Sequence, residues 1–131
     1  MGSQKVIKPS IEWMKQAQYD FDTAQAMFDS GRYIYAVFMS HMAMEKAIKG
    51  VFAHKLKEAP PKSHDLIYLS NKLNLALPGD YQIFIDKLND LSVPARYPDE
   101  LDKLLTQYDK KRVSELLIKT KEVLTWLTAQ L

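Results

Sequence analysis

The sequence predicts an all-α protein, an antiparallel up-and-down bundle of four main helices plus a short extra helix. Apolar residues recur every three or four positions over most of the chain, and no segment shows the strict apolar and polar alternation of a strand. Short stretches with proline or glycine separate the periodic segments, so consecutive helices should be antiparallel neighbours. We expect residues 1–131 to form a single helical domain, with residues 1–9 as a flexible tail.

The first two helices differ in their apolar patterns. The first is expected to have Ser10 as its N-cap, to carry one apolar stripe and to end at Gly31. The second, from about residue 32 to residue 57, is apolar around most of its circumference. A helix of that kind must be buried on several sides, which predicts a central position in the bundle.

Four further helical segments follow. Ser63 is the expected N-cap of a short helix over about 64–73, and Asp80 is the expected N-cap of a helix that ends at the stretch 91–100. Pro98 suits the first turn of a short helical piece. The last helix is expected over about 110–130. Its buried stripe should consist of Val113, Leu116, Leu117, Leu124 and Leu127.

The composition excludes several classes of protein. Apolar residues make up 47% and charged residues 26% of the chain, which is typical of a globular protein rather than a disordered one. The chain has no cysteine, which excludes disulfides and thiolate chemistry. The longest apolar run, from Tyr33 to Met39, is far shorter than the roughly 18 residues of a membrane span. The N-terminus has no apolar signal-peptide segment, so we expect a cytoplasmic protein with no membrane partner.

Positive charge is concentrated in the middle of the chain. The 18 basic and 16 acidic residues give a net charge of +2, which is too small to indicate a nucleic-acid-binding protein by itself. One region nevertheless holds a cluster of basic side chains, namely Lys46, Lys49, His54, Lys55, Lys57, Lys62 and His64. These are either solvated side chains that complement the C-terminus of a helix or part of a surface for an anion.

The motifs of self-contained enzymes are missing. There is no glycine-rich phosphate loop, no zinc-ligand spacing and no nucleophile motif, so we expect no catalytic residue, no metal site and no cofactor. His41, Glu45 and Lys49 form one polar stripe at i, i+4 and i+8 on the apolar second helix. The stripe is either an ion pair with a hydrogen-bonded histidine above it or the wall of a shared cleft or dimer interface.

The stretch LSVPARYPDE, residues 91–100, interrupts the helical pattern. It places Arg96 and Tyr97 between two prolines, which should hold both residues in a bent, non-helical backbone. In one interpretation Arg96 bonds the last carbonyls of the fourth helix and Tyr97 belongs to the core. In the other, Arg96 presents its guanidinium to a phosphate or a carboxylate, with Tyr97 as a stacking neighbour.

Three short motifs follow one another along the chain: EKAIK at 45–49, SHDL at 63–66 and ARYP at 95–98. With the long final helix, they resemble the HEPN domain (higher eukaryotes and prokaryotes nucleotide-binding), and the resemblance covers nearly the whole chain. It implies an antiparallel helical bundle that usually forms a homodimer. Members are often encoded beside a minimal nucleotidyltransferase, in two-part systems that include toxin–antitoxin pairs. In such pairs the helical partner is thought to bind nucleotide or the nucleotidyltransferase subunit.

A large branch of this family is ribonucleolytic and carries an arginine followed, after four to six residues, by a histidine. Arg96 matches the arginine, but Leu101, Asp102 and Lys103 occupy the positions where the resemblance implies the histidine. Metal-independent RNA cleavage needs a general acid and base that titrates near neutrality, and none of these three residues supplies one. His64, from another helix, is the remaining alternative for that role.

The residues and the resemblance together predict a non-catalytic module that binds a nucleotide or a partner. It would act as a homodimer with a minimal nucleotidyltransferase, and the candidates for an exposed dimer surface include Tyr35, Met39 and Met42. The expected ligand-binding residues are Arg96, Tyr97, Lys46, Lys49, Glu45 and His64. Two alternatives stay open: a metal-independent endoribonuclease toxin with a non-standard active site, and a dimerisation module without a ligand.

Overall fold

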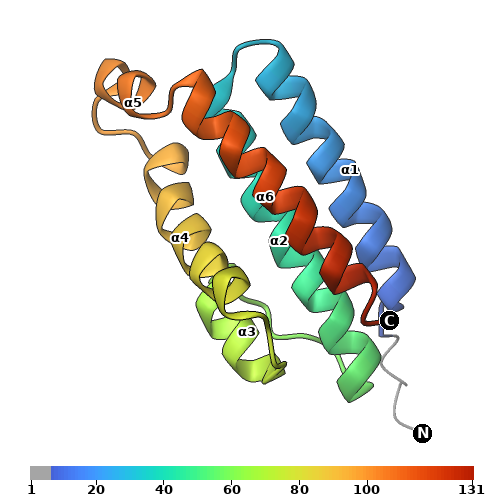
Figure 1. Ribbon diagram of the computed structural model, residues 1–131. Helices are drawn as coiled ribbons and strands as arrows, with labels where there is room; N and C mark the ends of the chain where they lie inside the picture. Colours follow the sequence, from blue (N-terminus) through green and yellow to red (C-terminus); the bar gives the residue numbers. More distant parts are fainter. Residues whose placement is uncertain (1–6) are drawn as a thin grey trace, which may run out of the picture.

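Residues 7–131 are described by a computed structural model, and within this range the chain forms six helices and no strand. The helices are α1 (Ser10–Asp29), α2 (Tyr33–Leu56), α3 (Leu66–Leu73), α4 (Gly79–Arg96), α5 (Leu101–Gln107) and α6 (Lys110–Thr128). Figure 1 shows α1, α2 and α6 side by side, with α3 and α4 next to them and α5 at one end. The predicted all-α bundle is confirmed. Residues 1–6 of the expected tail lie outside the described residues.

Helix α2 is the centre of the bundle. It contacts each of the other helices, and its side chains Val37, Met44, Ile48 and Val51 are almost completely buried. Its apolar circumference explains this position, because only a helix with neighbours on several sides removes so much apolar surface from water. The prediction that this segment is buried on several sides is confirmed.

Helices α1 and α2 are joined by a tight turn and pack closely. Gly31 has a left-handed backbone with φ of +77°, and it ends α1 where the sequence predicted. Farther along α2, a Cβ built on Gly50 would lie 3.0 Å from the Cβ of Trp13, so glycine permits the close approach of the two helices. The predicted N-cap Ser10 is wrong by one residue, since Ser10 is already helical and Pro9 is the N-cap.

Two further helix starts differ from the prediction. The N-cap of α3 is Asp65 rather than Ser63, because the Asp65 carboxylate accepts hydrogen bonds from two backbone N–H groups of the first turn. Helix α4 begins at Gly79, so Asp80 lies in its first turn instead of at its N-cap. There the negative charge of Asp80 is still favourable at the positive end of the helix dipole.

Helix α4 ends within the stretch 91–100, as predicted, but it continues through Pro94. Pro94 lies close to the end of the helix and removes only one helical hydrogen bond, because its nitrogen carries no hydrogen. Its neighbour Ala95 is buried in the core, which favours the helical path. Arg96 is therefore the last helical residue, and the predicted non-helical backbone is wrong at this position. Tyr97, with φ of −133° and ψ of 71°, does leave the helix.

Helices α5 and α6 complete the bundle. Pro98 precedes α5 instead of lying in its first turn, since Glu100 is the N-cap of that helix. The Tyr108 hydroxyl donates a hydrogen bond of 2.6 Å to the Leu91 carbonyl and ties the end of α5 to α4. The predicted stripe of α6 is buried in full, and it consists of Val113, Leu116, Leu117, Leu124 and Leu127. Between residues 7 and 131, none of the helices has the combination of length and hydrophobicity that crossing a membrane would require.

The candidates for a dimer surface on α2 are not equally accessible. Tyr35 is 57% exposed, as the sequence analysis expected. Met39 and Met42 are only half-buried, and Met39 packs against the core instead of standing free. Because α2 is so apolar, its neighbours cover part of the surface that was expected from the sequence to be exposed.

Candidate functional site

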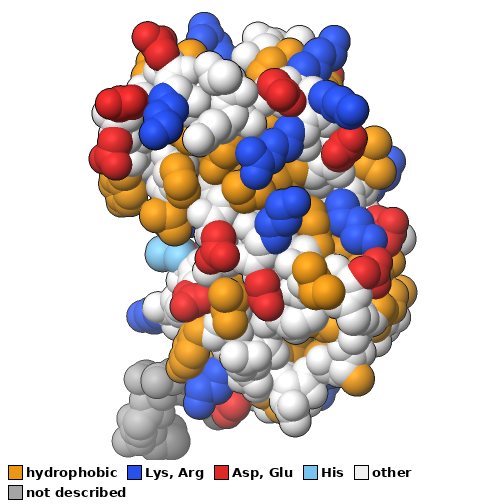
Figure 2. Space-filling model, turned by 60° about the vertical axis from the view of Figure 1, so that its left-hand side comes forward, with side chains coloured by type: hydrophobic (Ala, Val, Ile, Leu, Met, Phe, Trp, Pro, Cys, Tyr) orange, Lys and Arg blue, Asp and Glu red, His pale blue; other side chains and the backbone are white. Residues whose placement is uncertain are grey.

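A groove of about 440 Å³ lies between the outer face of α2 and the end of α4. It is lined by Tyr35, Phe38, Met42, His64, Ala95, Arg96 and Tyr97. On the face displayed in Figure 2, basic and acidic side chains are interspersed rather than gathered into one charged surface. Arg96 and His64 are the two basic side chains that line the groove, so an anion there would depend on them for electrostatic attraction.

Tyr97 lines this groove and also a second hollow, of about 490 Å³, between the end of α4 and α5. The second hollow contains Asp99, Glu100 and Lys103 but not Arg96. Tyr97 is 78% exposed, so the alternative in which it belongs to the core is wrong. Its ring is free to stack on a ligand at either side.

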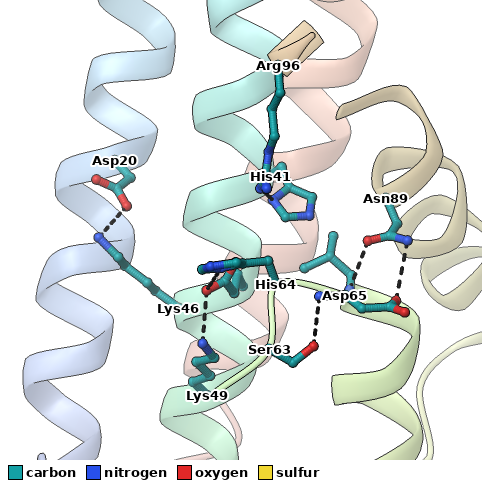
Figure 3. A network of polar contacts seen from close by, with 11 residues as sticks. Asp20, His41, Lys46, Lys49, Ser63, His64, Asp65, Asn89 and Arg96 are labelled. Carbon is teal, nitrogen blue, oxygen red and sulfur yellow. Dashed lines mark hydrogen bonds and ion pairs between the residues drawn. The ribbon is translucent and has the colours of Figure 1, made fainter. Parts of the chain in front are cut away.

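Arg96 is held by two side chains of α2. Its Nη2 lies 3.1 Å from Nδ1 of His41, and its Cζ lies 5.0 Å from the centroid of the Phe38 ring. Phe38 and His41 are one turn apart on the same face of the helix. Figure 3 shows the side chain of Arg96 extending from the end of α4 to His41. The guanidinium thus makes a cation–π contact with one ring and a hydrogen bond to the other.

His41 is buried, with only 1% of its surface exposed. Burial lowers the pKa of His41 to about 4, and the positive charge of Arg96 acts in the same direction. Glu45 and hydrogen bonds to Asn89 and to the His64 backbone act the other way. The imidazole is therefore neutral near pH 7. Because a guanidinium can only donate, Nδ1 of His41 accepts the hydrogen bond and the ring proton lies on Nε2.

Glu45, one turn further along α2 than His41, holds the side chain of His64 in place. Its two carboxylate oxygens lie 3.0 and 3.1 Å from Nδ1 of His64, and one of them accepts a hydrogen bond of 2.9 Å from Nζ of Lys49. Glu45 is 4% exposed, whereas the side chain of His64 is 67% exposed. Since Nδ1–H donates to the carboxylate, Nε2 is the ring nitrogen of His64 that remains for a ligand.

The loop that carries His64 is tied to α4. The side-chain oxygen of Asn89 accepts a hydrogen bond of 2.9 Å from the backbone N–H of Leu66, and its nitrogen lies 3.4 Å from the Asp65 carboxylate. On the other side of His64, the Ser63 hydroxyl accepts a hydrogen bond from the backbone N–H of Asp65. Figure 3 shows these contacts next to His41 and Arg96. The loop is therefore fixed to the helix that also carries the arginine.

The structure brings most of the predicted ligand-binding residues together. Arg96, Tyr97 and His64 line the groove. Glu45 and Lys49 form a buried ion pair behind His64, with 4% and 7% of their surfaces exposed. Lys49 is consequently occupied by a carboxylate and does not reach the groove as a free cation.

Lys46 is not part of this cluster. Its Nζ lies 2.7 Å from Oδ2 of Asp20, so it extends towards α1, as Figure 3 shows. Consecutive residues of a helix point in directions about 100° apart, which explains why Glu45 and Lys46 have different neighbours. Lys46 and Lys49, two members of the basic cluster, thus lie on different sides of α2.

The polar stripe of α2 combines both interpretations that the sequence allowed. Glu45 and Lys49 form the expected ion pair and His41 is hydrogen-bonded, yet the partners of the stripe, Arg96 and His64, line a groove. Sequence reasoning missed the partner of His41 and the whole role of Asn89. The position of His41 on the polar stripe could have indicated that it has a polar partner. Nothing in the sequence distinguishes Asn89 from other polar residues of an amphipathic helix.

These groups suit a ligand that carries a phosphate. A guanidinium donates N–H groups to phosphate oxygens, and Nε2 of His64 also donates when the ring is protonated on both nitrogens. Exposed aromatic rings such as Tyr35 and Tyr97 can stack on a base. His64, oriented by a buried carboxylate, could also transfer a proton. Within the part of the chain that the structure covers, no three side chains of metal-binding type lie close enough together to hold an ion.

A family model described as HEPN domain matches residues 11–130 of the chain. Similar solved structures include TT1696 from Thermus thermophilus, which is 23% identical and has a TM-score of 0.80 over 93% of this chain and 98% of that one. Another is ST0689, an archaeal HEPN homologue, which is 27% identical and has a TM-score of 0.75 over 95% of this chain and 98% of that one. No curated protein matches the sequence.

Proposed function

The chain belongs to the HEPN domain family, and from that premise we propose that it is a non-catalytic, nucleotide-binding helical module. Arg96 donates hydrogen bonds to a phosphate of the ligand, the imidazolium form of His64 donates another from Nε2, and Tyr97 stacks on the base. The observation that carries the proposal is that Arg96 and His64, from distant parts of the sequence, line one groove. A fork of guanidinium donors is suited to phosphate oxygens, and an imidazolium whose Nδ1–H is held by Glu45 adds the Nε2–H donor at a second position.

Glu45 and Lys49 contribute to this proposal from behind the groove. Glu45 orients His64, and Lys49 compensates the buried carboxylate, so neither touches the phosphate. Lys46 has no place in the proposed site, because its ammonium is paired with Asp20. The ligand contacts are thereby reduced to Arg96, Tyr97 and His64.

The proposal includes a homodimer that acts in the cytoplasm with a minimal nucleotidyltransferase, in a two-part system such as a toxin–antitoxin pair. The family resemblance supports this assembly, and exposed Tyr35 at the groove supports a protein contact there. The phosphate held by Arg96 and His64 would then belong either to a free nucleotide or to one bound by the nucleotidyltransferase.

Calorimetric titration with a panel of nucleotides tests the binding function. We expect wild-type affinity to fall with rising salt and to fall about tenfold in Arg96→Ala, since one charge-assisted hydrogen bond contributes about 1.4 kcal/mol. Arg32→Ala is the matched control, because it removes the same charge from an exposed position outside the groove. Equal losses in both variants would show non-specific electrostatics, and a wild type that binds no nucleotide would end the proposal.

The contact between His64 and Glu45 favours one second candidate, a metal-independent endoribonuclease. Nε2 of His64 would take the proton of a ribose 2′-hydroxyl, whose oxygen attacks the adjacent phosphorus while Arg96 stabilises the negative charge. The 5′-oxygen of the next nucleotide would leave and take a proton from water, so that a cyclic phosphate remains. His64 replaces here the histidine that is missing after Arg96.

Incubation of RNA with the purified protein and a metal chelator separates the two functions. The non-catalytic module predicts no cleavage. Cleavage that is lost in His64→Ala and Arg96→Ala, but kept in the control His54→Ala, would establish the ribonuclease instead. Cleavage that survives all three substitutions would point to a contaminant.

A further inference from the structure

Arg96 has no acidic partner. Within the described part of the chain, the ion pairs all join other residues, and the guanidinium donates instead to the neutral imidazole of His41. Glu45, one turn from His41, is the carboxylate that faces this cluster, and it is already shared by Lys49 and His64. The positive charge of Arg96 therefore stays uncompensated at the wall of the groove.

We infer that His41 is a positioning residue for Arg96, one that orients the guanidinium without neutralising it. A carboxylate in the same place would hold Arg96 at least as firmly, but it would cancel the charge that attracts a phosphate. A neutral nitrogen acceptor sets the direction of the side chain and leaves its full charge to the ligand. The inference rests on the proposed function and names the residue that prepares Arg96 for it.

The groups around His41 maintain the form of the ring that this role needs. Arg96 and Asn89 face it from α4, Glu45 from α2 and the His64 backbone from the loop before α3. Burial and the charge of Arg96 favour the neutral ring, and together they outweigh the opposing groups. A neutral ring with its proton on Nε2 presents the lone pair of Nδ1 to the guanidinium.

The hydrogen bond to His41 also determines which N–H groups of Arg96 remain free for an anion. A guanidinium carries five N–H groups, and the contact with His41 uses one on Nη2 of Arg96. Nε of Arg96 is buried and has no hydrogen-bond partner among the residues described. The donors left for an anion are therefore those on Nη1 and the second one on Nη2. The guanidinium also lies over the ring of Phe38, and this cation–π contact helps to keep it in place.

Three substitutions at His41 separate orientation from charge. His41→Asn keeps a neutral acceptor close to the position of Nδ1. His41→Asp places a negative charge on a side chain of the same shape as asparagine. His41→Leu removes the acceptor. Each variant is titrated with AMP, ATP, GTP, UTP and inorganic phosphate, and circular dichroism and thermal melting show whether it is folded.

We expect His41→Asn to bind within about threefold of the wild type, while His41→Asp and His41→Leu each lose about tenfold, as Arg96→Ala does. Wild-type affinity in a folded His41→Leu variant would overturn the inference. Wild-type affinity in a folded His41→Asp variant would overturn the part of it that concerns charge.

Nitrogen-15 NMR spectra of the ligand-free protein test the inference without the use of any ligand. At pH 7 we expect the His41 signals of an imidazole protonated on Nε2, and we expect Arg96→Ala to shift the Nδ1 signal while Arg32→Ala leaves it unchanged. A proton on Nδ1, or a signal that does not respond to Arg96→Ala, would overturn the inference. If the wild type binds none of the probes, the proposed function fails, and these spectra still show whether His41 orients Arg96.

Discussion

Glu45 and His64 are 19 residues apart in the chain, yet both carboxylate oxygens of Glu45 lie within 3.1 Å of Nδ1 of His64. The buried residue thus orients an exposed one, as His41 orients Arg96 one turn earlier on α2. The two basic side chains that line the groove are both aligned by the same helix. Loss of either acceptor, His41 or Glu45, from the polar stripe of α2 should therefore affect both stability and binding.

Replacing Glu45 by glutamine should destabilise the fold. The ammonium of Lys49 would stay buried without a counter-charge, and we expect the free energy of unfolding to fall by about 3 kcal/mol. Urea denaturation measures this, with Glu58→Gln at an exposed position as the control, where the change should stay within about 0.5 kcal/mol. The double variant Glu45→Gln, Lys49→Met should recover most of the loss. A stable single variant would contradict the importance of the pair.

His41 should make stability depend on pH. Its pKa is lowered in the folded state from 6.5 to about 4, so between these values the unfolded chain binds a proton that the folded chain does not. The contribution of His41 to the free energy of unfolding is then fully present above pH 6.5. It falls as the pH decreases towards 4 and does not change further below that. The loss is about 3 kcal/mol, because one pKa unit corresponds to about 1.4 kcal/mol. Urea denaturation of wild type and His41→Asn at pH 7 and pH 4.5 checks this, and equal losses in both proteins would contradict it.

Replacing Tyr97 should weaken binding without affecting the fold. The residue is 78% exposed, so Tyr97→Ala should leave the melting temperature unchanged. Loss of stacking on a base should reduce nucleotide affinity about tenfold, since such contacts contribute about 1–3 kcal/mol. Tyr97→Phe keeps the ring and should bind normally, and Tyr19→Ala, at a 74% exposed position on α1, is the control. Normal affinity in Tyr97→Ala would exclude stacking.

The protein should be a dimer in solution. Light scattering should report about twice the chain mass of 15.1 kDa at tens of micromolar protein. Tyr35→Glu, which places a charge on the exposed side of α2, should shift the equilibrium towards the monomer. The matched change Tyr68→Glu on α3 should not. A wild-type mass of one chain would count against the homodimer.

The helices themselves could be predicted from the sequence, because the forces that form them act over a few residues. Apolar spacing and the glycine at position 31 identified α1, and the apolar circumference of α2 predicted its central position. Predictions failed where two neighbouring residues were equally suitable, as with Ser63 and Asp65 at the start of α3. They also failed at Pro94, where burial of Ala95 keeps the chain helical for two residues beyond the proline.

At the candidate site, the sequence identified some of the residues, and the tertiary structure decided which of them meet. Residue types and the family resemblance were enough to single out Arg96 and His64, but they also included Lys46, which pairs with Asp20 on another side of α2. Only the tertiary structure decided that Arg96 meets His41, 55 residues away, because that contact depends on how α4 packs on α2. The neutral state of His41 follows from the same packing, since burial is what lowers its pKa. Local sequence determines which side chains are available, and the packing of the helices determines which of them meet and with what charge.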